Sequence, residues 1–589
     1  MSEPGPRAPA TTLADAANVI SEHSNQEIDA IESDAAFSPL MSRTEQMFPL
    51  LLPREIERMR PLGEATRWNA GDMLFTMGRP SPGLVVILRG TVRVTRRDAV
   101  GKVHSVVEQR AGNFLGEIAQ LYGLPCLGDG FALEATEGLV ILPAQIRKLL
   151  VMEAALGEKI MRALILRRAA LIEKGCGPVL VGDPQAPQMI SLQGLLQRNA
   201  YPFTMIDVRN HPDAMALLER WSASAADFPI VVCPDGTVLR APDENQVAAR
   251  LGWLPEFHAS HLYDVVIVGA GPAGLATAVY AASEGLSVAI FDCRGPGGQA
   301  SASARIENYL GFPSGISGQA LTARAFVQTQ KFGAHISIPT EVNALHCDRS
   351  PIETALADGR RIASRTVVIA TGATYRRPDI AGLDAFVGRG VFFGSSPVEA
   401  KLCRNQDVVL VGGGNSGGQA VVHLATVARH VYLLIRGETL ESSMSRYLID
   451  RIGQLPNVTL CTKTEVERLN GDVNGLTTVD CRCPRGPRSF QVRHLFLFTG
   501  AQPNTGWLTA CSVMTDPRGF VLTGAAVHKD SLDADDRTLE TNVPGVFAIG
   551  DVRAGSTKRV AAAVGEGAAV VAQIHGVLRQ RASAAHPLR

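Results

Sequence analysis

Residues 263–274 read Tyr-Asp-Val-Val-Ile-Val-Gly-Ala-Gly-Pro-Ala-Gly, an apolar run typical of a strand that leads directly into three closely spaced glycines. The glycines permit a tight turn and a close approach of the backbone to a ligand. The helix predicted over 275–284 directs unpaired N–H groups at a pyrophosphate. The strand predicted over 288–292 ends in Asp292, 18 residues after Gly274. A carboxylate at this place accepts a hydrogen bond from a ribose hydroxyl. The stretch predicts an adenine-dinucleotide half-site; the alternative is a glycine-rich turn without a ligand.

The same pattern recurs at residues 407–417, Asp-Val-Val-Leu-Val-Gly-Gly-Gly-Asn-Ser-Gly, again as a strand followed by a helix. The same count from Gly417 ends at Ile435, and Arg436 follows it where an acid would stand. A guanidinium suits a 2′-phosphate that a carboxylate would repel, so the sequence predicts NADPH over NADH. The alternative for Arg436 is a solvated charge at a strand end. The predicted NADPH residues are Gly412, Gly414, Asn415, Ser416, Gly417 and Arg436.

Two dinucleotide folds in series, the first split by the second, are typical of a flavin reductase that takes hydride from a nicotinamide. Residues 367–372 and 496–500 are predicted to carry the chain between the two units. Residues 546–551 are predicted to place Asp551 against the ribityl or pyrophosphate region of the flavin.

Residues 262 to about 580 resemble the bacterial thioredoxin reductases, which are FAD- and NAD(P)-dependent pyridine nucleotide-disulfide oxidoreductases. The matching motifs, in order, are Gly-Gly-Gln at 297–299, Ile-Glu-Asn-Tyr at 306–309, Gly-Gly-Gly-Asn-Ser at 412–416, Pro-Asn-Thr at 503–505 and Gly-Asp-Val at 550–552. The resemblance implies non-covalent FAD, a homodimer, and a nicotinamide domain that rotates against the FAD domain. With the glycine motif, the FAD contacts are Gly269, Gly271, Pro272, Ala273, Gly274, Asp292, Gly298, Gln299, Asn308, Thr371, Gly372, Asp551, Arg559 and Val560.

The chain departs from that family at three places. Thr557-Lys-Arg stands where the family reads Tyr-Arg-Gln, and the family's His-Arg-Arg pattern survives only as Ile435-Arg436-Gly437. The largest departure lies before the second glycine motif, where the family has Cys-Ala-Thr-Cys-Asp and residues 390–398 read Gly-Val-Phe-Phe-Gly-Ser-Ser-Pro-Val. Both cysteines and the acid are missing, so we predict no catalytic side chain, and electrons on the flavin need another exit.

Other cysteines are poor substitutes for the missing pair. The nearest, Cys403, lies six residues after Pro397 and has no neighbour with which to form a vicinal disulfide. Cys481 and Cys483 fall on one face of a predicted strand, which leaves a redox role open beside a bystander role.

Residues from about 177 to 255 follow the order βαβαββα, with Pro229 opening the third strand. This pattern resembles the thioredoxin/glutaredoxin fold, whose proline at that place is cis. That family carries its reactive cysteines at the start of the first helix, where this chain has Ala186 to Leu192 and no cysteine. Dithiol exchange needs a thiolate, so we interpret the unit as a docking or structural module.

Short apolar runs separated by glycines from Trp68 onward predict an antiparallel β-roll, followed by a connector helix over 143–174. Residues 45–150 resemble a cyclic-nucleotide-binding domain, with Gly116-Glu117 in the family's phosphate cassette, where the glutamate holds the ribose hydroxyl. The family's phosphate-pairing arginine is missing from Leu124-Pro-Cys126-Leu-Gly. We therefore expect weak or no binding of a cyclic nucleotide, and favour a degenerate sensory or docking domain.

Composition excludes several classes. The 589 residues hold 57 Lys plus Arg against 57 Asp plus Glu, so no net basic field attracts a nucleic acid. No run of about 18 apolar residues lacks a charge or a Gly or Pro break, and Met1 to Ala10 lack a signal-peptide core. We expect a soluble cytoplasmic protein without a membrane span. Ten cysteines without a Cys-x-x-Cys pair are too sparse for a disulfide scaffold, and no metal site is predicted.

The predicted fold class is multidomain: an N-terminal antiparallel β-roll, a thioredoxin-like α/β insert and two α/β dinucleotide-binding (Rossmann-like) domains. The predicted domains are a flexible tail over 1–40, the cyclic-nucleotide-binding-like domain and connector over 41–175, the thioredoxin/glutaredoxin-like domain over 176–256, the FAD domain over 262–374 and 500–589, and the NAD(P) domain over 375–499.

The predicted activity is hydride transfer from NADPH to FAD and on to an unidentified small-molecule or redox-protein acceptor. One alternative is an electron-transfer reductase that delivers electrons to a ferredoxin-like protein, a quinone or oxygen without any protein thiol. The other is a flavin- and nucleotide-responsive sensor with little turnover.

Overall fold

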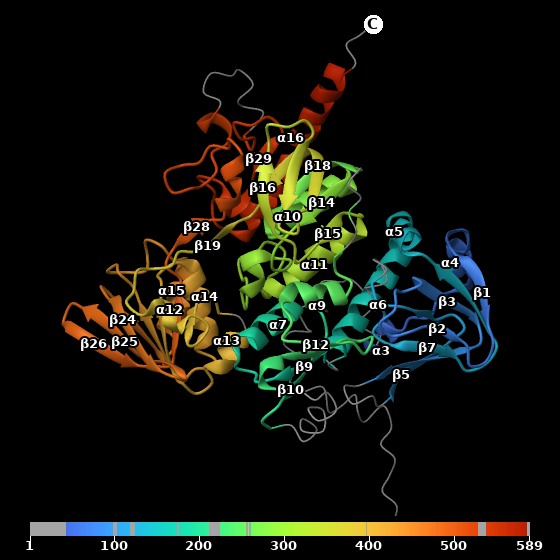
Figure 1. Cartoon of the computed structure of the whole chain (residues 1–589), viewed down its shortest axis with the longest axis horizontal. Coiled ribbons are helices and arrows are strands. Elements are labelled where there is room, and N and C mark those ends of the chain that lie inside the picture. The colour runs from blue at the N-terminus through green and yellow to red at the C-terminus, as the bar shows by residue number, and fades with distance from the viewer. Residues whose placement is uncertain are drawn as a thin grey trace, which may run out of the picture.

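A computed structural model covers the chain, and the structure describes residues 43–97, 103–117, 124–173, 176–210, 224–254, 257, 261–395, 397–527 and 538–585. The predicted tail over 1–40 lies outside these residues, as do residues 211–223, where the predicted βαβαββα order expects its second helix. Figure 1 shows a roll at one side, a small α/β unit beside it, and two larger α/β bodies, here called the central unit and the outer unit.

The roll consists of two antiparallel four-stranded sheets, as the glycine-punctuated pattern predicts. Their strand orders are β1-β8-β3-β6 and β2-β7-β4-β5. Buried Phe114, Leu139 and Ile141 pack against the flanking helices. The elements are α3 (Arg43–Met47), α4 (Pro53–Met59), η1 (Arg60–Leu62), β1 (Glu64–Trp68), β2 (Met73–Phe75), β3 (Leu84–Arg89), β4 (Thr91–Arg97), β5 (Val103–Arg110), β6 (Phe114–Leu115), β7 (Asp129–Ala132) and β8 (Thr136–Ile141).

The prediction of one connector helix over 143–174 is wrong in one respect. The segment forms two helices, α5 (Pro143–Met152) and α6 (Ala154–Glu173). Glu153 leaves the helical conformation at φ −113° and ψ 81°. Gly157 then packs so closely on the end of α5 that a Cβ there would lie 2.9 Å from the carbonyl oxygen of Leu150. A glycine at this point lets the start of α6 lie close to the end of α5.

The small unit has a four-stranded sheet in the order β10-β9-β11-β12, in which β9 and β10 are parallel and the other pairs antiparallel. The Phe228–Pro229 peptide bond is cis. Asp243 caps the last helix, because its carboxylate accepts the N–H of Gln246 at 2.7 Å. The elements are β9 (Val179–Gly182), α7 (Pro187–Arg198), β10 (Thr204–Asp207), η3 (Ala225–Asp227), β11 (Ile230–Val232), β12 (Val238–Arg240) and α9 (Glu244–Arg250).

The central unit contains a sheet in the order β15-β14-β13-β18-β17-β16, with β29 also paired to β18. Strands β14, β15, β18 and β29 run parallel to β13, whereas β16 and β17 form an antiparallel extension. The elements are β13 (Leu262–Val268), α10 (Pro272–Ser283), β14 (Val288–Phe291), η4 (Gly298–Ala302), α11 (Gly318–Lys331), β15 (His335–Ser337), β16 (Val342–His346), β17 (Ile352–Leu356), β18 (Arg361–Ile369), η5 (Gly506–Ala510), η6 (Gly524–Ala526), β29 (Val546–Ala548), η7 (Gly550–Val552) and α16 (Val560–Ala585).

Helix α16 is the one helix among the described residues that is long and apolar enough to cross a membrane, by length and composition, over Val560–Ala582. Its residues Val570, Val571 and Ile574 are buried in the core that α10 and the central sheet share. A core helix of a folded domain needs the same apolar residues, so composition here does not by itself indicate a membrane span.

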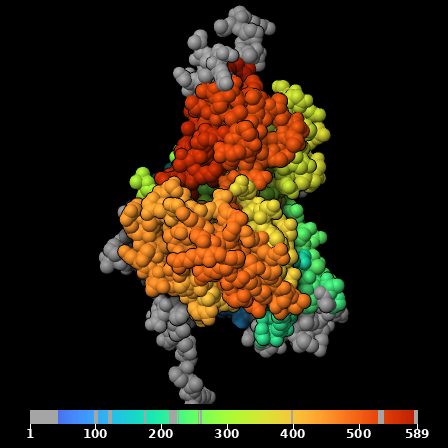
Figure 2. All heavy atoms as spheres, turned by 90° about the vertical axis from the view of Figure 1, so that its left-hand side faces the viewer, coloured from blue at the N-terminus to red at the C-terminus, as the bar shows by residue number. Residues whose placement is uncertain are grey.

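The outer unit combines a parallel sheet, β20-β27-β21-β22-β23, with an antiparallel meander, β24-β25-β26. The short strands β19 and β28 pair at the junction with the central unit. Figure 2 shows the outer unit (orange) below the C-terminal part of the central unit (red), with a recess between them. The elements are β19 (Ala373–Tyr375), α12 (Leu383–Phe386), β20 (Val391–Phe392), α13 (Pro397–Leu402), β21 (Asp407–Val411), α14 (Asn415–Leu424), β22 (His430–Leu434), α15 (Arg446–Gly453), β23 (Val458–Cys461), β24 (Glu465–Asp472), β25 (Gly475–Cys483), β26 (Gly486–Gln491), β27 (His494–Leu497) and β28 (Ala501–Pro503).

Candidate functional site

A cavity of about 1400 Å³ lies where the central, outer and small units meet. Sites for one drug-sized ligand commonly measure about 300–1,000 Å³, so this cavity has room for a large ligand and a second group beside it. Its walls come from the carboxyl ends of β13, β14 and β18, the amino ends of α10 and α14, and helix α7.

The first glycine motif forms the turn from β13 into α10, and each glycine has a different reason to lack a side chain. Gly269 has φ +108°, and a Cβ there would lie 2.3 Å from the carbonyl oxygen of Ala370. A Cβ on Gly274 would lie 1.9 Å from the carbonyl oxygen of Gly269, so this glycine permits helix and strand to pack. Gly271 lines the cavity and has no atom within 4 Å of the Cβ position. This open space is where a ligand can approach the backbone.

Asp292 follows β14 and holds this turn in place. Its carboxylate accepts the N–H groups of Ala270 at 2.9 Å, Arg294 at 2.8 Å and Gly295 at 3.0 Å. A carboxylate has about four lone-pair positions, which leaves capacity for one further donor such as a ribose hydroxyl. The predicted ligand-binding residue therefore has a positioning role in the free protein as well.

The structure brings the predicted FAD residues together, since all of them line the cavity except Gly274, which packs behind the turn. The side-chain amide of Gln299 donates to the carbonyl oxygen of Ala373. Two residues that the sequence analysis did not include among the FAD contacts, Asn504 and Trp507, also line the cavity. Asn504 is reciprocally bound to Thr371: its Nδ2 donates to the Thr371 carbonyl at 2.9 Å, and Thr371 Oγ1 donates to the Asn504 carbonyl at 2.8 Å. The Pro-Asn-Thr motif was the available signal.

Asp551 lines the cavity from η7, just before α16. Burial raises the pKa of its carboxyl above the ordinary value, the cation of Lys558 opposes that shift, and Glu566 adds to it. The N–H of Gly550 donates to Glu566 at 2.6 Å, which anchors the η7 turn to α16. A carboxyl that lines the cavity can hydrogen-bond to a hydroxyl group of a ligand.

The glycines of the second motif lack side chains for the same reasons as those of the first. Gly412 has φ +140°, and a Cβ there would lie 2.5 Å from the carbonyl oxygen of Phe498. A Cβ on Gly417 would lie 2.5 Å from the carbonyl oxygen of Gly412. Gly414 has no atom within 4 Å of its Cβ position. These glycines keep the backbone at the start of α14 open to a ligand.

Only part of the predicted NADPH set reaches the shared cavity. Asn415 and Ser416 line it, whereas Gly412, Gly414, Gly417 and Arg436 do not. Asn415 Oδ1 accepts the N–H of Ser445 at 2.7 Å. Arg436 is exposed after β22 and makes no hydrogen bond or ion pair with the residues that the structure describes.

The segment that replaces the family's dithiol also reaches the cavity, through Phe393, Gly394 and Ser395. The nearest thiol in sequence, Cys403, is fully buried, and burial raises its pKa to about 12. Burial likewise raises the pKa of Cys481 to about 12, and both Cys481 and Cys483 pack in or against the core of the outer unit. Cys403 and Cys481 are therefore protonated at neutral pH and are poor nucleophiles.

In the roll, the cassette glutamate is already engaged. Glu117 forms an ion pair with Arg168 of α6 at 3.0 Å, with side chains only 10% and 11% exposed. Arg167 donates to the carbonyl oxygen of Gly116 at 2.8 Å. Cys126, in the region where the phosphate-pairing arginine is expected, is buried, and burial raises its pKa to about 11. Two arginines of helix α6 thus bind Glu117 and the carbonyl oxygen of Gly116, in the cassette that a cyclic nucleotide would need.

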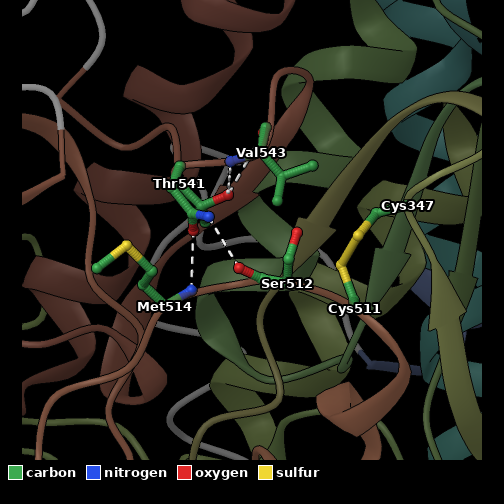
Figure 3. The surroundings of a disulfide bond; sticks show 7 residues. Cys347, Cys511, Ser512, Met514, Thr541 and Val543 are labelled. Atoms are coloured by element: carbon green, nitrogen blue, oxygen red, sulfur yellow. Dashed lines mark hydrogen bonds between the residues drawn. A yellow bond between two sulfur atoms is a disulfide. The ribbon is translucent and has the colours of Figure 1, made fainter.

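A disulfide that the sequence analysis missed joins Cys347 to Cys511 (Figure 3), with Cα atoms 5.6 Å apart. It connects the end of β16 to the end of η5, the segment that brings Trp507 to the cavity. Beside it, the side chain of Asn542 bridges the backbone of Ser512 and Met514, each at 2.8 Å. The two cysteines are 164 residues apart, so no local spacing indicated the pair.

Comparisons with known proteins place these features in context. The family model for pyridine nucleotide-disulphide oxidoreductase matches residues 263–567, and the cyclic nucleotide-binding domain model matches residues 65–152. An alkyl hydroperoxide reductase of Staphylococcus epidermidis is 32% identical over 317 residues, 53% of this chain and 58% of that protein. Thioredoxin reductase of Listeria innocua is 31% identical over 308 residues, 52% of this chain and 91% of that protein.

Among solved structures, thioredoxin reductase of Lactococcus lactis is 25% identical with a TM-score of 0.49, and covers 54% of this chain and 99% of that chain. The chain spans little more than half the length of the Staphylococcus relative.

Proposed function

Because the chain belongs to the pyridine nucleotide-disulphide oxidoreductase family, we propose that it binds FAD in the cavity, reduces it with NADPH, and passes the electrons to an acceptor without a vicinal dithiol. The observation that carries this proposal is the meeting of the 269–274 turn, Asp292 and Asp551 in one cavity. A FAD molecule needs this combination of backbone N–H groups and carboxylates along its length.

The chain's residues fit the cofactor. Gly271 and Gly372 leave open space at their Cβ positions, and the amino end of α10 offers N–H groups to a pyrophosphate. Asp292 has acceptor capacity left for a ribose hydroxyl. When bound, FAD supplies reversible acceptance of a hydride, and the protein's part is to position it and exclude water.

For the nicotinamide, the exposed Arg436 supports a preference for a 2′-phosphate. Asn415 and Ser416 line the cavity while Arg436 lies outside it. A dinucleotide bound over the turn at 412–417 therefore extends from the exposed corner toward the cavity. A homodimer stays a prediction from the resemblance, and a cytoplasmic location stays a prediction from the sequence composition.

The names of two relatives refer to alkyl hydroperoxide and to thioredoxin. Transfer of either activity to this chain meets the same obstacle, because Gly394 and Pro397 stand where the family has cysteines. We therefore assign the electron exit to the flavin itself.

The test is the Gly271→Val variant. Gly271 has an ordinary φ of −69°, and no described atom lies within 4 Å of its Cβ position, so the Cβ of a valine strikes no described atom and its methyl groups narrow the space of the ligand. Wild-type protein should purify with FAD and lose its flavin absorbance on anaerobic addition of NADPH. Gly271→Val should be folded, by circular dichroism, and colourless.

Gly453→Val is the matched control, because Gly453 is the exposed last residue of α15 and also has no atom within 4 Å of its Cβ position. It should keep its flavin. A wild-type protein that does not take up FAD, or a Gly271→Val variant with normal flavin content, would contradict the proposed site.

A further inference from the structure

We propose that the part of the cavity in front of Gly394 and Ser395 binds a small planar quinone, which takes the electrons that the missing dithiol would have taken. This inference rests on the proposed function, since it names the acceptor class for the same cavity.

The first observation is open space where the family has a thiol. Gly388 and Gly394 line the cavity, and among the residues that the structure describes neither has an atom within 4 Å of its Cβ position. Neighbouring side chains have therefore not closed over the place of the first cysteine. The loss of the dithiol leaves room for a ligand.

The second observation is the hydroxyl of Ser395. This residue is 7% exposed, lines the cavity, and its Oγ has no hydrogen-bond partner among the residues that the structure describes. The Oγ itself is enclosed by the protein. A buried hydroxyl without a partner costs free energy, and rotation of the Ser395 side chain toward the cavity lets a bound acceptor oxygen recover it. A carbonyl oxygen is the matching group.

The third observation is the character of the walls. Arg377 lies over the ring of Phe393, 5.6 Å from its centroid, and Tyr375 and Phe498 meet edge to face at 5.1 Å. Aromatic rings pack on flat apolar ligands by stacking or edge contacts. The aromatic residues that line the cavity include Tyr375, Phe392, Phe393, Phe498 and Trp507.

The fourth observation distinguishes a small molecule from a protein acceptor. Helix α7 of the small unit forms a wall of the cavity through residues from Pro187 to Arg198. It is held there because Gln319 Nε2 donates to the carbonyl oxygen of Gln197 at 3.0 Å, and Gly295 packs against the Arg198 side chain. A part of this chain thus closes one side of the cavity, which leaves less room for a protein acceptor than for a small molecule.

The electrons and protons balance as NADPH plus H⁺ plus quinone giving NADP⁺ plus hydroquinone. The quinone gains two electrons from the reduced cofactor, and its two carbonyl oxygens each gain a proton. Ser395 donates a hydrogen bond to the carbonyl oxygen on which negative charge develops. Ser395 keeps its own proton and is not consumed.

The experiment mixes the NADPH-reduced holoprotein, without oxygen, with 2-methyl-1,4-naphthoquinone or with ferricyanide, and follows the return of flavin absorbance. Ferricyanide accepts single electrons and needs no carbonyl site. Gly394→Leu should slow reoxidation by the quinone by about tenfold or more, and Ser395→Ala should raise the half-saturating quinone concentration by about five- to tenfold. Ser395→Thr should restore most of the binding.

Reoxidation by ferricyanide, flavin content and reduction by NADPH should change less than about twofold in these variants. The matched controls are Gly453→Leu and Ser489→Ala, because Ser489 is exposed in β26 and bound to Asp480, away from the cavity. A second readout needs no turnover: quinone added to oxidised holoprotein should shift the flavin spectrum, and less so in Ser395→Ala.

The outcomes separate the two proposals. Failure of NADPH to reduce the flavin would overturn the proposed function. Reduction by NADPH with quinone rates equal in wild type, Gly394→Leu and Ser395→Ala would overturn this inference alone, as would reoxidation by ferredoxin or thioredoxin but not by the quinone.

Discussion

Arg436 and Glu117 are charged residues whose roles depend on what surrounds them. Arg436 is exposed after β22 and has no ion pair among the described residues, so a ligand phosphate would meet a free guanidinium. Glu117 is buried in an ion pair with Arg168. We therefore predict that Arg436 selects for a nucleotide with a 2′-phosphate. We predict that Glu117 is not available to bind a cyclic nucleotide.

Changing Arg436 to Ala should raise the KM for NADPH by about tenfold or more and leave the KM for NADH nearly unchanged, because only NADPH carries the 2′-phosphate. Steady-state kinetics with both nucleotides and one acceptor measure this. Equal changes for both nucleotides would show that Arg436 acts in some other way.

Changing Cys403 to Ala, or Cys481 and Cys483 together to Ala, should leave quinone turnover within about twofold of wild type. Burial raises the pKa of Cys403 and of Cys481 to about 12, so neither is a thiolate at neutral pH. Turnover should be compared at equal flavin content. A variant that keeps its fold and flavin but loses turnover would identify a cysteine that carries electrons.

At the scale of elements, local sequence patterns predict helices and strands well. Contacts between distant segments cannot be predicted from such patterns. The strand and helix around Gly269 and around Gly412 form as predicted, because glycine spacing and apolar runs are local signals. The break at Glu153 lies close to Gly157, a local signal that the prediction of one connector helix did not use. The ion pair that occupies Glu117 comes from a helix residue 51 positions away and leaves no mark in the local sequence.

The roll should bind cyclic AMP and cyclic GMP weakly or not at all. Arg168 occupies Glu117, and the cassette region around Cys126 supplies no guanidinium for the phosphate. Calorimetric titration of the full chain tests this, and sub-micromolar affinity for either nucleotide would contradict it.

The Cys347–Cys511 disulfide should stabilise the segment that carries Trp507, and reducing it should cost about 2–4 kcal/mol of unfolding free energy. Disulfides are rare in reducing compartments such as the cytoplasm. This bond is therefore at odds with the expected cytoplasmic location. Of the ten cysteines, eight are free. Thiol titration of the denatured protein should count eight before reduction and ten after it, with a lower Tm for the reduced protein. Ten thiols without reductant would show that the bond does not form.

At the scale of the whole molecule, contacts connect the roll to the cavity. Leu127, beside the cassette region, is buried in the core of the small unit, and a Cβ on Gly252 would lie 3.0 Å from Pro125. The small unit's α7 then forms a wall of the cavity. The sequence predicted the separate units, but not that the small unit, which has no cysteines at the start of α7, stands against the flavin site. This arrangement keeps the alternative of a sensor open to test beside the enzyme.

The central claim is that a flavin without a neighbouring dithiol is the redox centre that NADPH reduces. Anaerobic titration of the purified protein with NADPH, followed by flavin absorbance, measures this directly. The account predicts complete reduction at one NADPH per FAD, which is two electrons. Consumption of two NADPH per FAD before the absorbance change is complete, which is four electrons, would show that a disulfide shares the electrons and would contradict the account.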